Sequence, residues 1–440
     1  MMKNFTKIIW LLTVVSVSVS AQQERGIMGA DNWLNGWTEF NPSTVDYGES
    51  THILSGNITE DTTLYKAHTY LLLGNVFVTN NAILSIEPGT VIMGDSQSKA
   101  TLTITVGAAI IAEGTSTDPI VFTSNKTTKK AGDWGGIIIL GDGHTNKLEK
   151  SSGTSFYAKI EASNYKYTNF GGEGLKDNSG YISYVRVEYA GGKTKRSNVS
   201  NALLLGGLGA KTTINNVMVS YSAGNSFNVI GGEVNMDKMV SYKSNGNDYS
   251  FSYGAVCHIN NSLAVRSPYI SSGESRCINA VSYNSVKEVD FTKQNTVVIA
   301  KNMTLLTETK NLDYEIEVGL IKESIYIGEN TNFKIDRSVI SGFNKAVILG
   351  ENTKINDASL ARIQFENTYF NNCNGTVFLN FNNNNERLES WYKNPSFFNI
   401  YSKTNPSELF IDLDNGKRPD YRLLKNKIMA MSNGSKITNN

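Results

Sequence analysis

The chain has 440 residues, of which 41 are basic and 40 acidic, giving a formal net charge of +1. This balance provides no basic excess that would direct the protein to nucleic acid or to an anionic membrane surface. Charged residues make up only 18% of the chain. The remaining polarity comes mainly from Asn, Ser, Thr and Gly, which are residues of tight turns.

Residues 1–21 have the features of a Sec signal peptide. Two lysines precede an apolar run, Ile8–Val15, and Val19-Ser20-Ala21 then offers the small residues that signal peptidase reads. The apolar run is too short to span a membrane. We therefore expect an exported protein with no transmembrane segment in its mature chain. Its expected location is the outer membrane, the cell surface or the extracellular space.

Residues 22–50 are expected to form an N-terminal cap or linker. They contain Trp33, Trp37 and Phe40, and large aromatic side chains would cover the apolar end of a first coil. Such a cover is needed because an open solenoid end exposes strand edges that pair with other chains.

Internal repetition is the strongest signal of architecture. Leu84–Ile92 recurs eighteen positions later as Leu102–Ile110, and Val219–Ser222 recurs twenty-one positions later as Val240–Lys243. A repeat near twenty residues without a helical apolar period is typical of one β-helix coil. A sandwich or propeller would instead show hairpin turns about every 8–12 residues. We therefore predict an all-β, right-handed, single-stranded parallel β-helix over residues 51–379.

A polar insert at about residues 145–180 interrupts this solenoid. Loops on a rigid scaffold often carry binding function, and aromatic rings stack on sugars or anchor protein contacts. The ligand-binding candidates are therefore the four aromatic residues of the insert, Tyr157, Tyr165, Tyr167 and Phe170. The alternative is that the insert is a lid packed on the flank of the solenoid.

The same insert contains the acids Glu161, Glu173 and Asp177. Because calcium tolerates irregular oxygen ligands, these are weak calcium candidates, and their alternative role is loop solvation. No other cofactor is expected. The chain has no Asp-Asp pair and its four histidines are not at metal-ligand spacing, so no catalytic residue is assigned.

The three cysteines are Cys257, Cys277 and Cys373. An odd number in an exported chain allows one disulfide at most. Cys257 and Cys277 are about one coil apart in the sequence, so they are candidates for that disulfide. Small buried free thiols are the alternative.

Residues 380–440 are expected to form a C-terminal cap and a tail. Their aromatic residues would cover the last coil, as at the N-terminal end. The sequence leaves open whether residues 311–440 continue the solenoid or form a separate cap.

Several stretches of the sequence carry a family resemblance, and they are Leu84–Ile92, Ile111–Thr115, Pro119–Ser124, Gly132–Gly141, Asp177–Gly180 and Tyr184–Gly191. They resemble a family of secreted or cell-surface proteins of Bacteroidota, whose members are often labelled hypothetical, T9SS-associated or multidrug transporter proteins. The resemblance covers roughly residues 30–310. It implies a parallel β-helix at the cell surface and little defined chemistry.

The chain departs from this family in two turns. In relatives these turns are rich in Asp and Glu, whereas Ala223–Asn228 and Asn245–Ser250 carry mostly Asn and Ser here. Any cation that those acids bind in relatives would therefore lose most of its ligand charge in this chain.

Two functions remain open at the level of the sequence. The favoured one is a non-enzymatic surface protein that binds a protein or glycan, as an adhesin or as an accessory subunit of an outer-membrane complex. The alternative is a polysaccharide lyase or glycoside hydrolase of the β-helix type, whose acids would converge from distant coils.

Overall fold

The computed structural model describes residues 24–157, 159–174, 177–192, 201–375, 377–379 and 386–424. The expected signal peptide lies outside these ranges, as do residues 380–385 and 425–440 of the expected C-terminal cap and tail.

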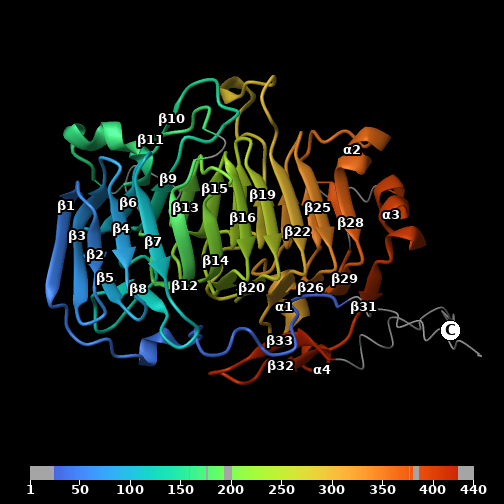
Figure 1. The fold of residues 1–440 in the computed structure, drawn as a ribbon. Coiled ribbons are helices and arrows are strands. Elements are labelled where there is room, and N and C mark those ends of the chain that lie inside the picture. The colour runs from blue at the N-terminus through green and yellow to red at the C-terminus, as the bar shows by residue number, and fades with distance from the viewer. Residues whose placement is uncertain are drawn as a thin grey trace, which may run out of the picture.

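The described chain forms a right-handed parallel β-helix in which successive strands of each coil join three parallel ladders (Figure 1). The first ladder contains β2 (Thr62–Leu64), β4 (Ile83–Ile86), β7 (Ala109–Glu113), the first parts of β12 (Gly180–Glu188) and β14 (Thr213–Ser220), β16 (Glu233–Asp237), β19 (Val256–Asn260), β22 (Val297–Lys301), β25 (Asn332–Asp336) and β28 (Ile363–Glu366). The second ladder contains the first parts of β1 (His52–Ile58) and β3 (Thr69–Val78), β5 (Val91–Gly94), β8 (Ile120–Ser124), the second parts of β12 and β14, β17 (Val240–Tyr242), β20 (Leu263–Arg266), β23 (Thr304–Thr307), β26 (Val339–Phe343), β29 (Tyr369–Cys373) and β31 (Ile400–Ser402). The third ladder contains the ends of β1 and β3, β6 (Thr101–Ile104), β9 (Gly136–Leu140), β13 (Asn201–Gly206), β15 (Asn225–Ile230), β18 (Tyr249–Ser252), β21 (Ile278–Ala280), β24 (Ile325–Ile327), β27 (Val347–Leu349) and β30 (Val377–Leu379).

The remaining elements are short and lie outside the ladders. Two antiparallel strand pairs are β10 (Ser151–Ser152) with β11 (Asn169–Phe170), and β32 (Phe410–Asp412) with β33 (Asp420–Leu423). The α-helices are α1 (Leu312–Glu317), α2 (Asp357–Arg362), α3 (Glu386–Tyr392) and α4 (Pro406–Leu409). The 3-10 helices are η1 (Pro42–Thr44), η2 (Thr154–Phe156), η3 (Ala162–Thr168), η4 (Val286–Glu288) and η5 (Pro395–Phe397).

The predicted fold class is confirmed, but the repeats that predicted it are not whole coils. Leu84 pairs with Ile110 in the next coil, whereas Leu102 lies in the third ladder and pairs with Val76 and Ile137. The eighteen-residue repeat therefore relates two strand–turn–strand units at different corners of the solenoid. The twenty-one-residue repeat is also one residue short, because Val240 pairs with Met218.

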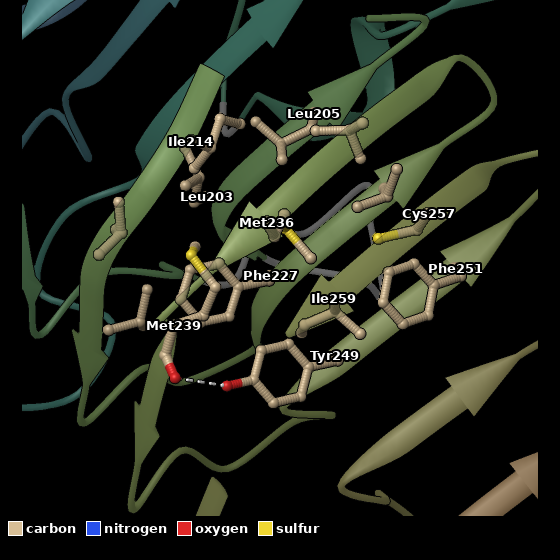
Figure 2. Packing of buried hydrophobic residues seen from close by; sticks show 14 of the residues in the cluster. Leu203, Leu205, Ile214, Phe227, Met236, Met239, Tyr249, Phe251, Cys257 and Ile259 are labelled. Carbon is tan, nitrogen blue, oxygen red and sulfur yellow. Dashed lines mark hydrogen bonds between the residues drawn. The ribbon is translucent and has the colours of Figure 1, made fainter. Parts of the chain in front are cut away.

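Inward-facing apolar side chains stack in columns along the axis of the solenoid (Figure 2). Phe227 and Tyr249, neighbours in the third ladder, have ring centroids 5.3 Å apart and nearly parallel planes. The buried Tyr249 hydroxyl donates to the carbonyl oxygens of Met239 (3.1 Å) and Leu263 (2.7 Å). The core therefore accepts a tyrosine because its polar end is satisfied by backbone acceptors.

Left-handed residues bend the chain between the first and second ladders. Asn261, Asn302 and Asn367 occupy this position in three coils, with φ between 46° and 53°. Asn adopts this conformation more readily than most residues with a Cβ. The high Asn content of the sequence is thus partly explained by these corners.

Residues 24–50, here called the strap, run along the outside of the second ladder (Figure 1). The Gly26 N–H donates to the Arg337 carbonyl in a late coil, and the Thr51 N–H donates to the Thr69 carbonyl in the first coils. Trp37 and Phe40 pack against Tyr184 and Tyr242. The aromatic residues expected to cover the first coil therefore lie along the flank instead.

The solenoid continues past residue 311. Strands β24 to β30 extend the three ladders, and β31 adds a last strand to the second ladder. Residues 403–424 then fold back over the flank, where Phe410 and Tyr421 join the apolar cluster of the strap. Among the described residues, no helix is long and apolar enough to cross a membrane.

Candidate functional site

The insert is mainly a lid on the third-ladder flank. Tyr157 and Phe170 are buried in a cluster with Phe77, and the Tyr157 hydroxyl bonds to the Thr103 hydroxyl at 2.9 Å. Tyr167 is partly buried against the Phe77 ring. Only Tyr165 is exposed, at 43%. The structure thus gives three of the four predicted binding aromatics a packing role.

The three predicted calcium ligands have different surroundings. Glu161 is exposed at the start of η3, the Glu173 carboxylate lies 3.4 Å from His144, and the Asp177 carboxylate accepts from the Asp142 N–H at 3.1 Å. In the part of the chain that the structure describes, no group of three or more His, Cys, Asp or Glu is placed to hold a metal ion. Calcium binding by the chain stays a prediction.

The three thiols are free, so the candidate disulfide between Cys257 and Cys277 is not formed. Both residues belong to one coil, Cys257 in β19 and Cys277 just before β21, rather than to stacked positions of neighbouring coils. Burial raises the pKa of both thiols. They behave as small core side chains.

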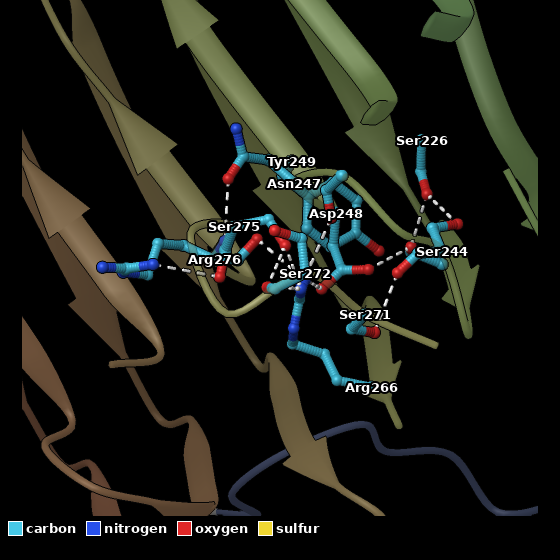
Figure 3. Close-up of polar contacts among 12 residues, drawn as sticks. Ser226, Ser244, Asn247, Asp248, Tyr249, Arg266, Ser271, Ser272, Ser275 and Arg276 are labelled. Atoms are coloured by element: carbon cyan, nitrogen blue, oxygen red, sulfur yellow. Dashed lines mark hydrogen bonds and ion pairs between the residues drawn. The ribbon is translucent and has the colours of Figure 1, made fainter. Parts of the chain in front are cut away.

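A buried polar cluster lies at the turn between β17 and β18 (Figure 3). The Asp248 carboxylate is fully buried and accepts from Arg266 Nη1 at 2.8 Å and from the Ser241 hydroxyl at 2.5 Å. The Ser226 hydroxyl continues the network, 2.6 Å from that of Ser241 and 2.7 Å from that of Ser244. Burial raises the pKa of Asp248, and the Arg266 charge opposes this.

This cluster holds the loop between β20 and β21 against the solenoid. The Arg266 guanidinium donates to Ser275 Oγ and to the Arg276 carbonyl oxygen, and the Ser271 hydroxyl donates to the Ser244 carbonyl oxygen at 2.8 Å. The cluster is sealed from solvent, so we assign it a positioning role. What it positions is residues 267–276, which present Tyr269 to solvent.

A groove of ≈ 800 Å³ lies beside this loop. Its walls are the ends of β17 and β23, the β20–β21 loop, α1, the strap and the folded-back segment 405–421. Its aromatic lining consists of Phe40, Tyr242, Tyr269 and Tyr421, and its charged lining consists of Lys243, Glu308, Lys310, Glu315 and Asp414. Tyr269 is 71% exposed, so one face of an aromatic ring remains open to a ligand.

Charged side chains of the groove are linked to its aromatic wall. The Glu308 carboxylate accepts from Lys243 Nζ at 2.7 Å and from the Tyr421 hydroxyl at 3.3 Å. Burial and the nearby Glu308 charge raise the pKa of Tyr242 and Tyr421. Both phenols stay protonated at neutral pH, and the Tyr421 hydroxyl donates to Glu308.

Sequence patterns do not predict this groove as a whole, because its residues come from segments far apart in the chain. Lys243 and Glu308 lie in different coils, and Tyr421 arrives from beyond the last coil. One local signal is Pro268, a residue that favours turns, followed directly by the aromatic residue Tyr269. The other residues that line the groove have no comparable local signal in the sequence.

A second buried carboxylate, Glu188, lies on the outer side of β12 beneath the strap. Its oxygens lie 3.0 and 3.3 Å from the Tyr47 hydroxyl, which donates to it, and 3.4 Å from Arg186 Nε at the closest. Burial raises the pKa of Glu188 above its ordinary 4.5, and the charge of Arg186 opposes this.

We expect Glu188→Gln to reduce the dependence of stability on pH. With a raised folded-state pKa, the folded chain keeps a proton that the unfolded chain releases, so this contribution is complete below about pH 4.5 and is lost as pH rises through the folded pKa. Urea unfolding from pH 4 upward measures this. The stability of the natural protein relative to the variant should fall with rising pH, and a rise would contradict the expectation.

Solved structures resemble the chain only weakly, whereas a family model matches most of it. The surface protein and adhesin PfbA of Streptococcus pneumoniae is similar at 8% identity over 74% of this chain and 91% of its own, with a TM-score of 0.30. The ORF18 protein of Geobacillus virus E2 shows 12% identity over 79% of this chain and 56% of its own, with a TM-score of 0.18. No curated protein sequence matches the chain. The model of the pectate-lyase-like β-helix domain matches residues 56–404, and the chain therefore belongs to that family.

Proposed function

We propose that this protein is a non-enzymatic, exported surface protein that binds a glycan chain in the groove beside Tyr269. The observation that carries the proposal is the exposed side chain of Tyr269 in a groove of ≈ 800 Å³ that is lined by both aromatic and charged side chains. Export rests on the expected signal peptide.

The lining of the groove suits a sugar better than an apolar ligand. Aromatic faces pack against the C–H face of a sugar ring, and fixed polar groups at the edges bind its hydroxyls. Tyr269 supplies such a face, while Lys243 and Glu308 supply a donor and an acceptor that are already oriented by their ion pair. Preorganised groups of this kind reduce the entropy cost of binding.

The engagement of two of the three groove carboxylates, Glu308 and Glu315, supports the non-enzymatic part of the proposal. Glu308 is bound by Lys243 and Tyr421, and Glu315 accepts from the Thr309 hydroxyl. A general acid or base needs a proton position open to substrate. The alternative, a polysaccharide lyase or hydrolase, is favoured by one observation: the Lys243–Glu308 pair places a basic and an acidic group side by side in the groove.

We expect Tyr269→Ala to weaken glycan binding by about two- to tenfold, which corresponds to about 0.5–1.5 kcal/mol for one aromatic contact. Isothermal titration calorimetry with a panel of neutral and acidic oligosaccharides measures this. The matched control is Tyr165→Ala, which removes an exposed tyrosine from the insert. If Tyr165→Ala weakens binding and Tyr269→Ala does not, the insert is the binding site.

The enzyme alternative has its own assay. The mature chain is incubated with uronic-acid polysaccharides and calcium, and with neutral polysaccharides, while unsaturated products and new reducing ends are followed. We expect no turnover. Turnover that disappears in both Lys243→Ala and Glu308→Gln would replace the binding proposal by the enzymatic one.

A further inference from the structure

A second hollow, of ≈ 600 Å³, lies between the strap, β12 and the turn that joins β32 to β33. Its charged lining consists of three cations and one carboxylate, namely Arg186, Lys417, Arg418 and Glu39. Arg186 reaches it from the outer side of β12, and Lys417 and Arg418 reach it from the turn. The excess of positive charge distinguishes this pocket from the groove beside Tyr269.

Arg186 has hydrogen-bonding capacity that the described residues do not use. The residue is 9% exposed, and its Nη2 donates to the Tyr47 hydroxyl at 2.9 Å. Its Nε lies 3.4 Å from Glu188 Oε1 and has no hydrogen-bond acceptor in the described part of the chain. A guanidinium carries five N–H donors, and a buried donor without an acceptor is unfavourable. This Nε is itself closed off from solvent, so what Arg186 offers to the pocket that it lines is its positive charge and the terminal N–H groups of its guanidinium.

The neighbouring carboxylate, Glu188, lies close to Arg186 without accepting a hydrogen bond from its Nε. Glu188 is fully buried, and burial raises its pKa, although the Arg186 charge and the hydrogen bond from Tyr47 oppose the shift. The other carboxylate, Glu39, accepts from the Asn41 N–H at 2.8 Å, so it is held by the strap.

The cations at the rim are carried by a fixed turn. The Asn415 side-chain oxygen accepts from the N–H groups of Lys417 (3.3 Å) and Arg418 (3.0 Å). Both side chains are exposed, and therefore free to close over a bound group. Arg is suited to the planar, multi-point recognition of oxyanions, and Lys adds a mobile point charge.

We propose that this pocket binds a doubly charged tetrahedral oxyanion, sulfate or phosphate, either free or as an ester on a larger molecule. Arg186 holds it from the floor, and Lys417 and Arg418 hold it from the rim. The site is independent of the proposed glycan groove, although Phe40 and Pro419 border both hollows.

The test measures thermal stabilisation and calorimetric binding of the mature chain with inorganic sulfate and inorganic phosphate, at ionic strength held constant with sodium chloride. A ligand that binds only the folded state raises Tm with concentration. We expect both anions to raise Tm above the chloride baseline, and the double variant Lys417→Ala/Arg418→Ala to bind at least tenfold more weakly. The control Lys211→Ala/Lys287→Ala removes two exposed lysine charges elsewhere and should bind like the natural chain.

Arg186→Lys tests the floor of the pocket, because it keeps the positive charge and removes the planar guanidinium group. If it unfolds like the natural chain in chloride, it should lose most of the sulfate response. If Arg186→Lys is less stable than the natural chain in chloride, the double variant Lys417→Ala/Arg418→Ala alone decides whether the pocket binds the anion. Unchanged binding in the rim variant, or an equal loss in the remote control, would overturn the site. Equal binding of acetate would overturn the tetrahedral class, and a sulfated or phosphorylated sugar that binds tighter than the free ion would identify the ester form.

Discussion

Asp248→Ala is expected to lower the free energy of unfolding by about 3–5 kcal/mol, because it leaves a buried guanidinium without its counter-charge. The side chains of Asp248 and Arg266 are 0% and 6% exposed, and their closest N–O distance is 2.8 Å. The substitution also removes the acceptor of the Ser241 hydroxyl. Few substitutions outside the apolar core would have a comparable effect.

Two controls separate the charge from the packing. Asp248→Asn keeps the shape and one acceptor, and should be destabilised through loss of the charge. The double variant Asp248→Ala/Arg266→Met removes both ions, so it should be more stable than Asp248→Ala alone. Urea unfolding followed by both circular dichroism and tryptophan fluorescence measures the series, because solenoids often depart from two-state behaviour. A double variant that loses the full sum of the two single losses would contradict the pairing.

Loss of the Asp248–Arg266 ion pair should also weaken glycan binding. Arg266 holds the β20–β21 loop through Ser275 and the Arg276 carbonyl oxygen, and this loop carries Tyr269 to the groove. Arg266→Met/Asp248→Ala should therefore bind glycan more weakly than the natural chain, even where the solenoid remains folded. Binding as tight as that of the natural chain would show that the cluster does not position Tyr269.

Fold class was predictable from the sequence because strand and turn chemistry is local. The Leu84–Ile92 unit and its copy each form a strand, a turn with a left-handed Gly89 or Gly107, and a second strand. That local unit occurs at more than one corner of a coil, which is why the repeat indicated a solenoid but misjudged the coil length. The length of a coil depends on loops that do not repeat.

The site was less predictable because its contacts join distant segments. The strap contacts coils that are formed by residues far along the chain. The Ile27 N–H, for example, donates to the Thr304 hydroxyl. No periodicity of the sequence reports such a pairing. The aromatics of the insert were singled out because a polar context makes a tyrosine look exposed, yet Tyr157 and Phe170 have a solenoid flank to pack on. The polar residues around them sit at the outer surface of the same lid.

One motif singled out for its family resemblance, Gly132–Gly141, has a structural explanation. Trp134 is fully buried and its ring stacks on Phe122, with centroids 6.4 Å apart. Its Nε1 donates to the Glu188 carbonyl oxygen at 2.8 Å. Burial raises the pKa of Asp133, but hydrogen bonds from Lys130, Lys126 and Ser124 outweigh it and hold that pKa below its ordinary value.

The glycines around Trp134 make room for the indole and for the chain. A Cβ at Gly94 would lie 2.5 Å from the Cγ of Trp134, so only glycine fits beneath the ring. Gly136 has φ of +119°, and a Cβ there would lie 2.5 Å from the Asn201 carbonyl oxygen. The motif therefore allows close packing at the place where the chain enters β9, and this packing is sufficient to explain its residues.

Trp134→Ala should accordingly cost about 3–5 kcal/mol, through lost burial and the cavity that remains. Trp134→Phe keeps a ring on Phe122 but leaves the Glu188 carbonyl oxygen without its donor, so a loss of about 1–3 kcal/mol is expected. Gly94→Ala should destabilise the natural chain by overpacking, by about 1–3 kcal/mol, but much less in the Trp134→Ala background, where the methyl group enters the cavity. Urea unfolding of the natural chain, Trp134→Ala, Gly94→Ala and the double variant gives the coupling energy between positions 94 and 134 directly. Additive losses would show that Gly94 and Trp134 do not depend on each other, and the packing explanation of the motif would fail.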